Sequence, residues 1–216
     1  MGPSLSKLFI PVLAMGIVIL ASNELVQHPV QGALFGEDLS LLLTWGAFTY
    51  PIAFLVTDTT NRIFGVGPAR RVVAVGFVLG VGLTIVAALV IASGVSRATE
   101  ISIWQALFND PEALAMLRTA VASGSAFLVA QLLDIKVFDL LRENAWWKAP
   151  TASSLLGSAI DTGIFFSLAF AGTGLPWVTW AIGDFCAKLL MIGVLLYPFR
   201  LLICTYLRSF RVARNL

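Results

Sequence analysis

The sequence predicts an all-α integral membrane protein made of six transmembrane helices. Of its 216 residues, 58% are hydrophobic and only 12% are charged. Soluble domains contain about 45–50% apolar and about 25% charged residues, so this composition is that of a membrane protein. Six mostly apolar segments of roughly 20 residues, the length that crosses a bilayer, are separated by short polar stretches. The expected helices, which form a single domain over 1–216, cover residues 7–26, 39–57, 72–94, 117–139, 152–172 and 175–199.

The first segment has features of a signal peptide, and the second is interrupted by a proline. Lys7 precedes the first apolar run, but no clean small-residue cleavage site follows Ala21-Ser22, so an uncleaved helix is expected rather than a signal peptide. Tyr50-Pro51 interrupts the second segment. A broken helix is tolerated in a membrane where neighbours or a water-lined cavity satisfy the freed carbonyls. The second helix is therefore expected to be a cavity wall.

The third segment is a long apolar run that carries Gly76, Gly80 and Gly82. Small residues allow two membrane helices to approach closely. Six helices are few for a complete alternating-access path, so we consider a homodimer that uses this glycine surface.

The fourth segment contains Gln131 and Asp134, which are three residues apart and share a helical face. A carboxamide beside a carboxylate can recognise both donors and acceptors of a flat heterocycle. The alternative is that Asp134 lies near the cytoplasmic end and pairs with a loop cation such as Arg62 or Lys148.

The fifth segment contains Asp161, about ten residues and thus about 15 Å from the helix start at Ala152, near the bilayer centre. Ser154, Gly157 and Ser158 share its face. Charges inside a bilayer are costly and usually mark a cavity or a partner. The alternative is a small-residue packing stripe in which Asp161 merely bonds to a neighbour.

Two further pairs of polar residues are spaced four apart. Asp184 and Lys188 in the sixth segment can pair along one face, either as a structural ion pair or as part of a site. Asp58 and Arg62, with Asn61 between them, follow the second segment. We expect them at the membrane interface, as a structural clasp or as substrate contacts.

The distribution of positive charge predicts the orientation. Eleven of the 14 Lys and Arg residues fall on one side, Arg97 and Arg118 fall on the other, and Lys188 is within a helix. The positive-inside rule then places both termini of this multi-pass protein in the cytoplasm. The eleven residues are Lys7, Arg62, Arg70, Arg71, Lys136, Arg142, Lys148, Arg200, Arg208, Arg211 and Arg214.

Several functional classes are excluded by what the sequence lacks. It has no GxxxxGK[ST] loop for nucleotide phosphates and no metal-ligand spacing, so no cofactor or metal is expected. The net charge of +2 gives no reason to expect nucleic-acid binding. Cys186 and Cys204 are interpreted as buried hydrophobic residues, and the lone His28 as a surface residue.

An intramembrane enzyme is also disfavoured. Ile182-Gly183-Asp184 only partly matches the Gly-x-Gly-Asp pattern of aspartyl proteases, because Ala181 occupies the first glycine position. A serine protease of the rhomboid kind would need a membrane-embedded histidine. We therefore do not expect an enzyme.

Several motifs in order carry a resemblance to a known family. With Asp184 and Lys188, they make the chain similar, over nearly its whole length, to the queuosine-precursor transporter family, also called vitamin-uptake-transporter-like. The motifs are Thr57-Asp58-Thr59-Thr60-Asn61-Arg62-Ile63-Phe64-Gly65 with Ala69-Arg70-Arg71, then Gln131-Leu132-Leu133-Asp134-Ile135-Lys136-Val137-Phe138, then Trp147-Lys148-Ala149-Pro150-Thr151-Ala152-Ser153 through Gly157 to Ile160-Asp161-Thr162.

The resemblance implies a six-helix inner-membrane protein that imports queuosine precursors for tRNA queuosine salvage, namely the deazaguanine base preQ0 (7-cyano-7-deazaguanine) and, as a second candidate, preQ1. It also implies a size and span count similar to the substrate-binding subunits of energy-coupling-factor transporters, without an obligatory ATPase partner. The alternative is a membrane-embedded binding subunit for another vitamin or base that works with a separate energy-coupling module.

Deazaguanine chemistry suits the buried polar residues. The base presents two adjacent N–H donors, which an ionised carboxylate from Asp161 or Asp134 can accept together. Gln131 or Asn23 would satisfy the ring carbonyl, and aromatic side chains would cover the flat faces. The aromatic candidates are Trp45, Phe48, Phe54 and Phe165. The sequence is compatible with both proton-coupled uptake and facilitated diffusion.

Overall fold

The computed structural model describes the backbone of residues 5–25, 28–34 and 36–214, almost all of it helical. The elements in chain order are α1 (Leu5–Leu25), β1 (Ala33–Leu34), β2 (Glu37–Asp38), the 3-10 helix η1 (Leu39–Leu41), α2 (Gly46–Thr49), α3 (Pro51–Phe64), α4 (Val66–Thr99), α5 (Ile103–Asn109), α6 (Pro111–Leu141), α7 (Lys148–Phe170) and α8 (Trp177–Arg214).

Four of these helices are long and apolar enough to cross a membrane. They are α4, α6, α7 and the part of α8 that ends at Leu207. The apolar part of α1, Lys7–Ser22, is shorter. The expectation of an all-helical membrane protein is therefore confirmed, whereas four spans rather than six meet the length criterion among the described residues.

The bounds expected for the second helix, 39–57, are wrong. A small hairpin and a 3-10 turn, capped by the Asp38 carboxylate accepting from Ser40 N at 2.9 Å, occupy its first part. Pro51 then begins α3, because its missing N–H and fixed φ suit the first helical position. Gly65 ends α3 at φ 89°, a conformation that glycine adopts without strain.

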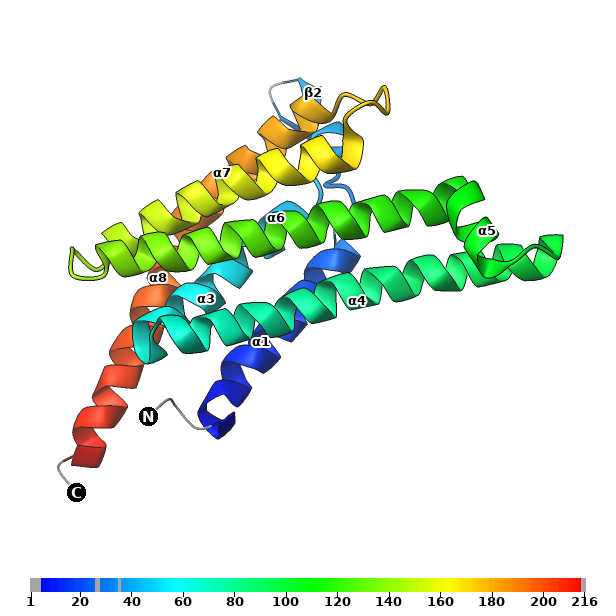
Figure 1. The fold of residues 1–216 in the computed structure, drawn as a ribbon. Helices are drawn as coiled ribbons and strands as arrows, with labels where there is room; N and C mark the ends of the chain where they lie inside the picture. Colours follow the sequence, from blue (N-terminus) through cyan, green and yellow to red (C-terminus); the bar gives the residue numbers. More distant parts are fainter. Residues whose placement is uncertain (1–4, 26–27, 35, 215–216) are drawn as a thin grey trace.

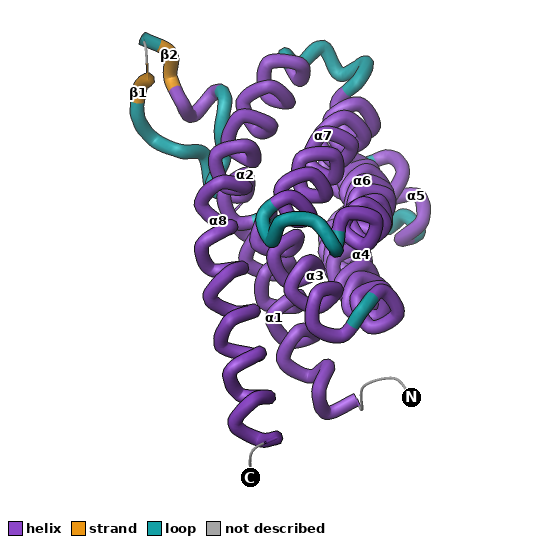
Figure 2. The backbone as a smooth tube through the Cα atoms, turned by 90° about the vertical axis from the view of Figure 1, so that its left-hand side faces the viewer, coloured by secondary structure: helices purple, strands orange, loops and turns teal. Residues whose placement is uncertain are grey.

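α4, α6 and α7 run along a common direction, and α1 and the C-terminal part of α8 are inclined to it (Figure 1). The α3–α4 and α6–α7 connections lie at the same end as the beginning of α1 and the end of α8. We call this the α3–α4 end. The small hairpin, α5 and the α7–α8 turn lie towards the opposite end, which we call the α7–α8 end; Figure 2 shows the hairpin standing above the helices there.

The core forms where α1, α3, α4 and α6 meet. It contains Met15, Val72, Val73, Phe127 and Ile135, among other buried residues. Large apolar side chains also remain exposed along the outer faces of α1, α4 and α8, as expected of surfaces that meet lipid.

Close packing inside the chain uses the glycines that the sequence suggested for a homodimer. A Cβ on Gly76 would approach Met15 and Ile19 of α1 to 2.8 Å, and one on Gly80 would approach Ile19 to 3.2 Å. Only Gly82 of this set faces open space. These positions therefore bring α1 against α4, and they give no support to a second subunit.

A second close approach fixes the segment before α2 onto α8. A Cβ on Gly183 would lie 2.6 Å from the backbone oxygen of Leu42. Glycine is therefore needed here for the backbone of this segment to rest on α8.

Both cysteines lie on the outer face of α8, contrary to expectation. Cys186 and Cys204 are exposed free thiols. Apolar surroundings in the sequence did not mean burial, because the surface of a membrane protein is itself apolar. His28 is exposed, as predicted.

Candidate functional site

Two groups of polar side chains lie within the helical bundle. The first, which we call the Lys188 cluster, consists of Tyr50, Asp161, Thr162, Asp184 and Lys188. The second, which we call the α3–α6 cluster, consists of Thr57, Asp58, Asn61, Gln131, Asp134, Ser153 and Ser154. Each cluster brings together residues that are far apart in the sequence.

The Lys188 cluster is a hydrogen-bonded ion network. Lys188 Nζ lies 2.8 Å from Asp161 Oδ2 and 2.6 Å from Asp184 Oδ2. Lys188 also donates to Thr162 Oγ1 at 3.0 Å, and Thr162 donates to Asp184 Oδ2 at 2.8 Å. The ammonium lies 5.4 Å from the centre of the Tyr50 ring. The predicted pair of Asp184 and Lys188 is confirmed, with Asp161 as a second carboxylate.

Asp161 is engaged through both of its oxygens. Oδ2 accepts from Lys188, and Oδ1 accepts from the Tyr50 hydroxyl at 3.2 Å. This arrangement matches the alternative in which Asp161 bonds to neighbouring side chains.

The α3–α6 cluster connects two helices through successive contacts. Thr57 Oγ1 donates to Gln131 Oε1 at 2.6 Å, and Asn61 Nδ2 donates to Ile135 O at 3.1 Å. Asp58 and Asp134 are buried between these two hydrogen bonds, one on each helix.

α7 covers the carboxyl pair with two hydroxyl groups. Ser153 and Ser154 donate to Asp58 Oδ1 and Oδ2 at 3.2 and 3.3 Å. Asp58 and Asp134 are 2% and 0% exposed, so their carboxyl groups lie in the protein interior rather than at the interface.

Several buried polar atoms near this cluster have no protein partner. Among the described residues, six buried side-chain atoms lack a hydrogen bond, and four of them belong to Gln131, Asp134 and Ser158. They are Gln131 Nε2, Asp134 Oδ1, Asp134 Oδ2 and Ser158 Oγ. Leaving such groups unpaired costs about 1–3 kcal/mol each, and more for a charge. These atoms therefore point to a ligand, water or proton that completes them.

The charged residues expected at the membrane interface do not form the ion pairs that the sequence suggested. Among the described residues, no ion pair joins Asp58 to Arg62, and none joins Asp134 to Arg62 or Lys148. Arg62 Nη1 instead donates to Arg142 O at 2.6 Å, and Arg142 Nη2 donates to Asn61 O and Oδ1 at 2.9 and 2.6 Å. The expected Asp58–Arg62 clasp is therefore not found among the described residues, and Arg62 and Asn61 instead join the end of α3 to the end of α6 through Arg142.

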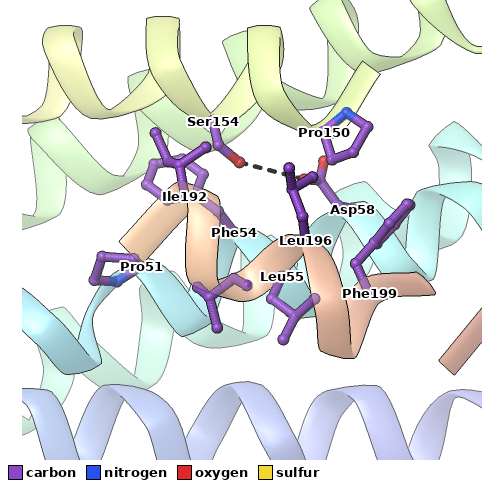
Figure 3. A pocket seen from close by; sticks show the side chains of 10 residues that line it. Pro51, Phe54, Leu55, Asp58, Pro150, Ser154, Ile192, Leu196 and Phe199 are labelled. Atoms are coloured by element: carbon purple, nitrogen blue, oxygen red, sulfur yellow. Dashed lines mark hydrogen bonds between the residues drawn. The ribbon is translucent and has the colours of Figure 1, made fainter. Parts of the chain in front are cut away.

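A small pocket reaches the carboxyl pair from the side of α8 (Figure 3). Its volume is about 20 Å³, enough for one water molecule. Asp58 and Ser154 supply its polar lining, and Pro51, Phe54, Leu55, Pro150, Ile192, Leu195, Leu196 and Phe199 supply the apolar remainder. A flat heterocycle needs far more room, so its entry requires the helices to separate.

The aromatic candidates are divided between the interior and the periphery. Phe54 is 2% exposed and lines the pocket, and a Cβ on Gly157 would lie 2.7 Å from its ring. Trp45 is half-exposed and, with His28 and Pro29, lines an open hollow of about 660 Å³. Its ring centre lies 6.0 Å from that of Phe48.

Phe165 packs against other aromatic rings. Phe165 contacts Phe166 and Phe170 edge to face, with ring centres 5.1 and 5.9 Å away. The side chain of Asn23 lies outside the described residues. Of the four predicted aromatic residues, Phe54 is thus the one that lines the pocket at Asp58.

Sequence reasoning missed Thr57, Thr162 and the Tyr50 hydroxyl as parts of these networks. The available signal was the regular spacing of Thr57, Asp58 and Asn61 on one side of a helix. It was obscured because the helix was expected to end at residue 57. Among the described residues, no group of three His, Cys, Asp or Glu side chains is placed to hold a metal ion.

Comparison with known proteins identifies the family. Residues 44–203 match the family model described as "Putative vitamin uptake transporter". This range contains both polar clusters. The chain belongs to this family.

Curated members of the family are similar over most of this chain. The "Queuosine precursor transporter" of Escherichia coli is 38% identical over 193 residues, which cover 84% of this chain and 79% of the relative. The "Probable queuosine precursor transporter" of Haemophilus influenzae is 35% identical, over 83% of this chain and 78% of the relative. A Bacillus subtilis protein with the same name is 29% identical over 73% of this chain. No solved structure matches.

Proposed function

We propose that this chain imports queuosine precursors, 7-deazaguanine bases such as preQ0, across the inner membrane. The names of the curated relatives, the family match over 44–203 and the four membrane-length apolar helices support this proposal. It rests on one observation in the site itself, which is the set of buried polar atoms without partners at Gln131 and Asp134.

These atoms complement the pairing edge of a guanine-type base. That edge presents two N–H donors and one carbonyl acceptor side by side. Asp134 offers two acceptor oxygens, and Gln131 Nε2 offers a donor one helical turn away. The carboxylate would accept both N–H groups of the base, and the carboxamide would donate to its carbonyl.

Asp134 suits this role better than Asp161. Both oxygens of Asp161 are occupied, by Lys188 and Tyr50, whereas those of Asp134 have no hydrogen-bond donor. Thr57 orients the Gln131 carboxamide, since its hydroxyl donates to Oε1 and leaves Nε2 free to donate to a ligand. Phe54, beside the pocket, supplies an aromatic face.

Binding to the purified, detergent-solubilised chain tests this proposal. We expect preQ0 to raise the melting temperature, and guanine and biotin to serve as comparison ligands. Ligand at 100 times its Kd stabilises by about 2.7 kcal/mol. Asp134→Asn should abolish the shift, because an amide cannot accept two adjacent donors.

Asp139→Asn is the matched control for this substitution. Asp139 is on the same helix, but it is exposed and pairs with Arg142 at 3.0 Å. Its variant should keep the shift with preQ0. Absence of a shift in the unmodified chain, or an undiminished shift in Asp134→Asn, would refute this assignment.

We also propose an orientation in the membrane, which is argued from the positions of the positive charges. The α3–α4 end carries Arg62, Arg70, Arg71, Arg142 and Lys148, so it would face the cytoplasm together with both termini. We further propose that the chain acts without an ATPase partner. Uptake of preQ0 by proteoliposomes that contain only this chain would support that, and uptake that requires an added ATPase would contradict it.

A further inference from the structure

Two carboxyl groups share one buried place between α3 and α6. Asp58 and Asp134 are 2% and 0% exposed, and both lie between the same two contacts of α3 with α6, the Thr57–Gln131 and Asn61–Ile135 hydrogen bonds. Ser153 and Ser154 donate to Asp58, whereas both oxygens of Asp134 lack a donor. Two ionised carboxylates in this position would repel each other at close range in a medium of low polarity.

The neighbouring cations of α3 and α6 are committed elsewhere. Arg62 donates to Arg142 O, and Arg142 binds Asn61 and Asp139. Lys136 is on an exposed face of α6.

The helices on the other sides supply no cation either. On α8, Lys188 is bound by Asp161 of α7 and by Asp184. The α8 side chains that face Asp58 across the pocket are apolar, namely Ile192, Leu195, Leu196 and Phe199. Among the described residues, no Lys or Arg forms an ion pair with Asp58 or Asp134.

We propose that the Asp58–Asp134 pair binds one proton and retains it throughout the transport cycle, so that base uptake is facilitated diffusion and not proton-driven accumulation. The proton forms an O–H bond on Asp58 and is shared by hydrogen bonding with Asp134. It replaces the missing cation and leaves the pair with a single negative charge. The part of this proposal that concerns transport rests on the proposed function.

The retained proton is compatible with base binding. A carboxylate has about four lone-pair sites, so Asp134 can accept the O–H of Asp58 and the two N–H groups of the base together. Loss of the proton would leave two charges that push α3 and α6 apart. Addition of a second proton would remove an acceptor from Asp134. Both the empty and the loaded closed forms therefore need the same single proton, and none is moved per cycle.

The first test uses the protein without base. Thermal stability is measured against pH for the unmodified chain, for Asp58→Asn, and for the exposed control Asp139→Asn. A folded protein that holds a proton released on unfolding loses stability as pH rises. We expect this alkaline loss in the unmodified chain and in Asp139→Asn. It should be much smaller in Asp58→Asn, whose amide mimics the protonated carboxyl.

An infrared difference spectrum gives a second readout, which would not change if Asp58 had only a structural role. The carbonyl-stretch band of a protonated buried carboxyl should be present at neutral pH in the unmodified chain and absent in Asp58→Asn. The same alkaline loss in all three proteins, together with no such band, would overturn the proton site. These measurements need no ligand, so they are independent of the identity of the substrate.

The transport part is tested in proteoliposomes with preQ0 and imposed pH gradients. Uptake by the unmodified chain should reach the same internal and external concentrations whichever side is acidic, and it should weaken at alkaline pH. Accumulation driven by an inward proton gradient would overturn the retained proton. If preQ0 fails to bind while the alkaline loss and the infrared band are found, the proposed substrate is wrong and the proton site stands.

Discussion

Asp161 and Lys188 are 27 positions apart in the sequence, yet they form a buried ion pair of 2.8 Å between α7 and α8. Lys188 also pairs with Asp184 at 2.6 Å on its own helix. One ammonium group thus balances two carboxylates, which makes the three residues unequal in their effect on stability.

Replacing Lys188 should therefore be the most damaging of the three changes. Lys188→Met leaves both carboxylates without a cation, and removal of one partner from a buried pair costs about 3–5 kcal/mol. Asp184→Asn should cost much less, because Lys188 keeps Asp161. The free energy of unfolding in mixed micelles measures both changes.

A double substitution separates charge from shape in this cluster. Lys188→Met combined with Asp161→Asn should recover part of the stability that Lys188→Met loses, since one uncompensated charge is removed. Equal losses in the single and double variants would show that the ion pair is not the source of the effect.

Gly157 should be intolerant of even one added methyl group. Its Cβ would meet the ring of Phe54 at 2.7 Å and the backbone oxygen of Ala130 at 3.5 Å. Gly157→Ala is expected to cost about 1–3 kcal/mol by overpacking. Phe54→Leu in the same chain should relieve much of this cost, which a double-mutant cycle would detect as non-additivity.

Gly163 provides the matched control on the same helix. A Cβ there meets nothing within 4 Å. Gly163→Ala should be neutral or stabilising by up to about 1 kcal/mol, because alanine has the higher helix propensity. Equal effects of alanine at 157 and 163 would contradict the close contact with Phe54.

The clasp at the α3–α4 end should depend on arginine and not only on positive charge. Arg142 donates to two oxygens of Asn61 and accepts from Arg62 through its own carbonyl. Both bonds are made by Nη2, which lies one covalent bond farther along the side chain than the Nζ of a lysine, so Arg142→Lys leaves the ammonium short of the two oxygens. We expect a loss of roughly 1.5–3 kcal/mol in the free energy of unfolding. Lys136→Met, an exposed change on the same helix, should have little effect.

Labelling of single cysteines would test the proposed orientation. Asn144 is exposed in the α6–α7 connection, and Thr173 is exposed in the α7–α8 turn. With Cys186 and Cys204 replaced by alanine, Thr173→Cys should react with a membrane-impermeant maleimide added to intact cells. Asn144→Cys should react only after the cells are opened. The reverse pattern would invert the topology.

The sequence allowed the apolar helices to be predicted better than the broken one. α4, α6, α7 and α8 are marked by apolar runs long enough to cross a bilayer, a local property that the sequence states directly. The expected second helix failed because Thr57, Asp58 and Asn61 appear too polar for a helix interior. Their burial is explained by Gln131, Ile135, Ser153 and Ser154, which lie 74 to 96 positions away.

The roles of the two central aspartates could not be separated by sequence. Asp134 and Asp161 both follow small or polar residues on one face of an apolar helix. What distinguishes them is the position of Lys188 and Tyr50, which occupy Asp161 and leave Asp134 without a donor. Such a difference depends on how helices are brought together and is not encoded in local spacing.

The contact between Gly183 and the backbone of Leu42 couples two distant parts of the molecule mechanically. Gly183 adjoins Asp184, so the turn of α8 that carries one carboxylate of the Lys188 cluster also supports the segment before α2. A change in the position of α8 that separated Lys188 from Asp161 would therefore also alter the packing of the segment before α2.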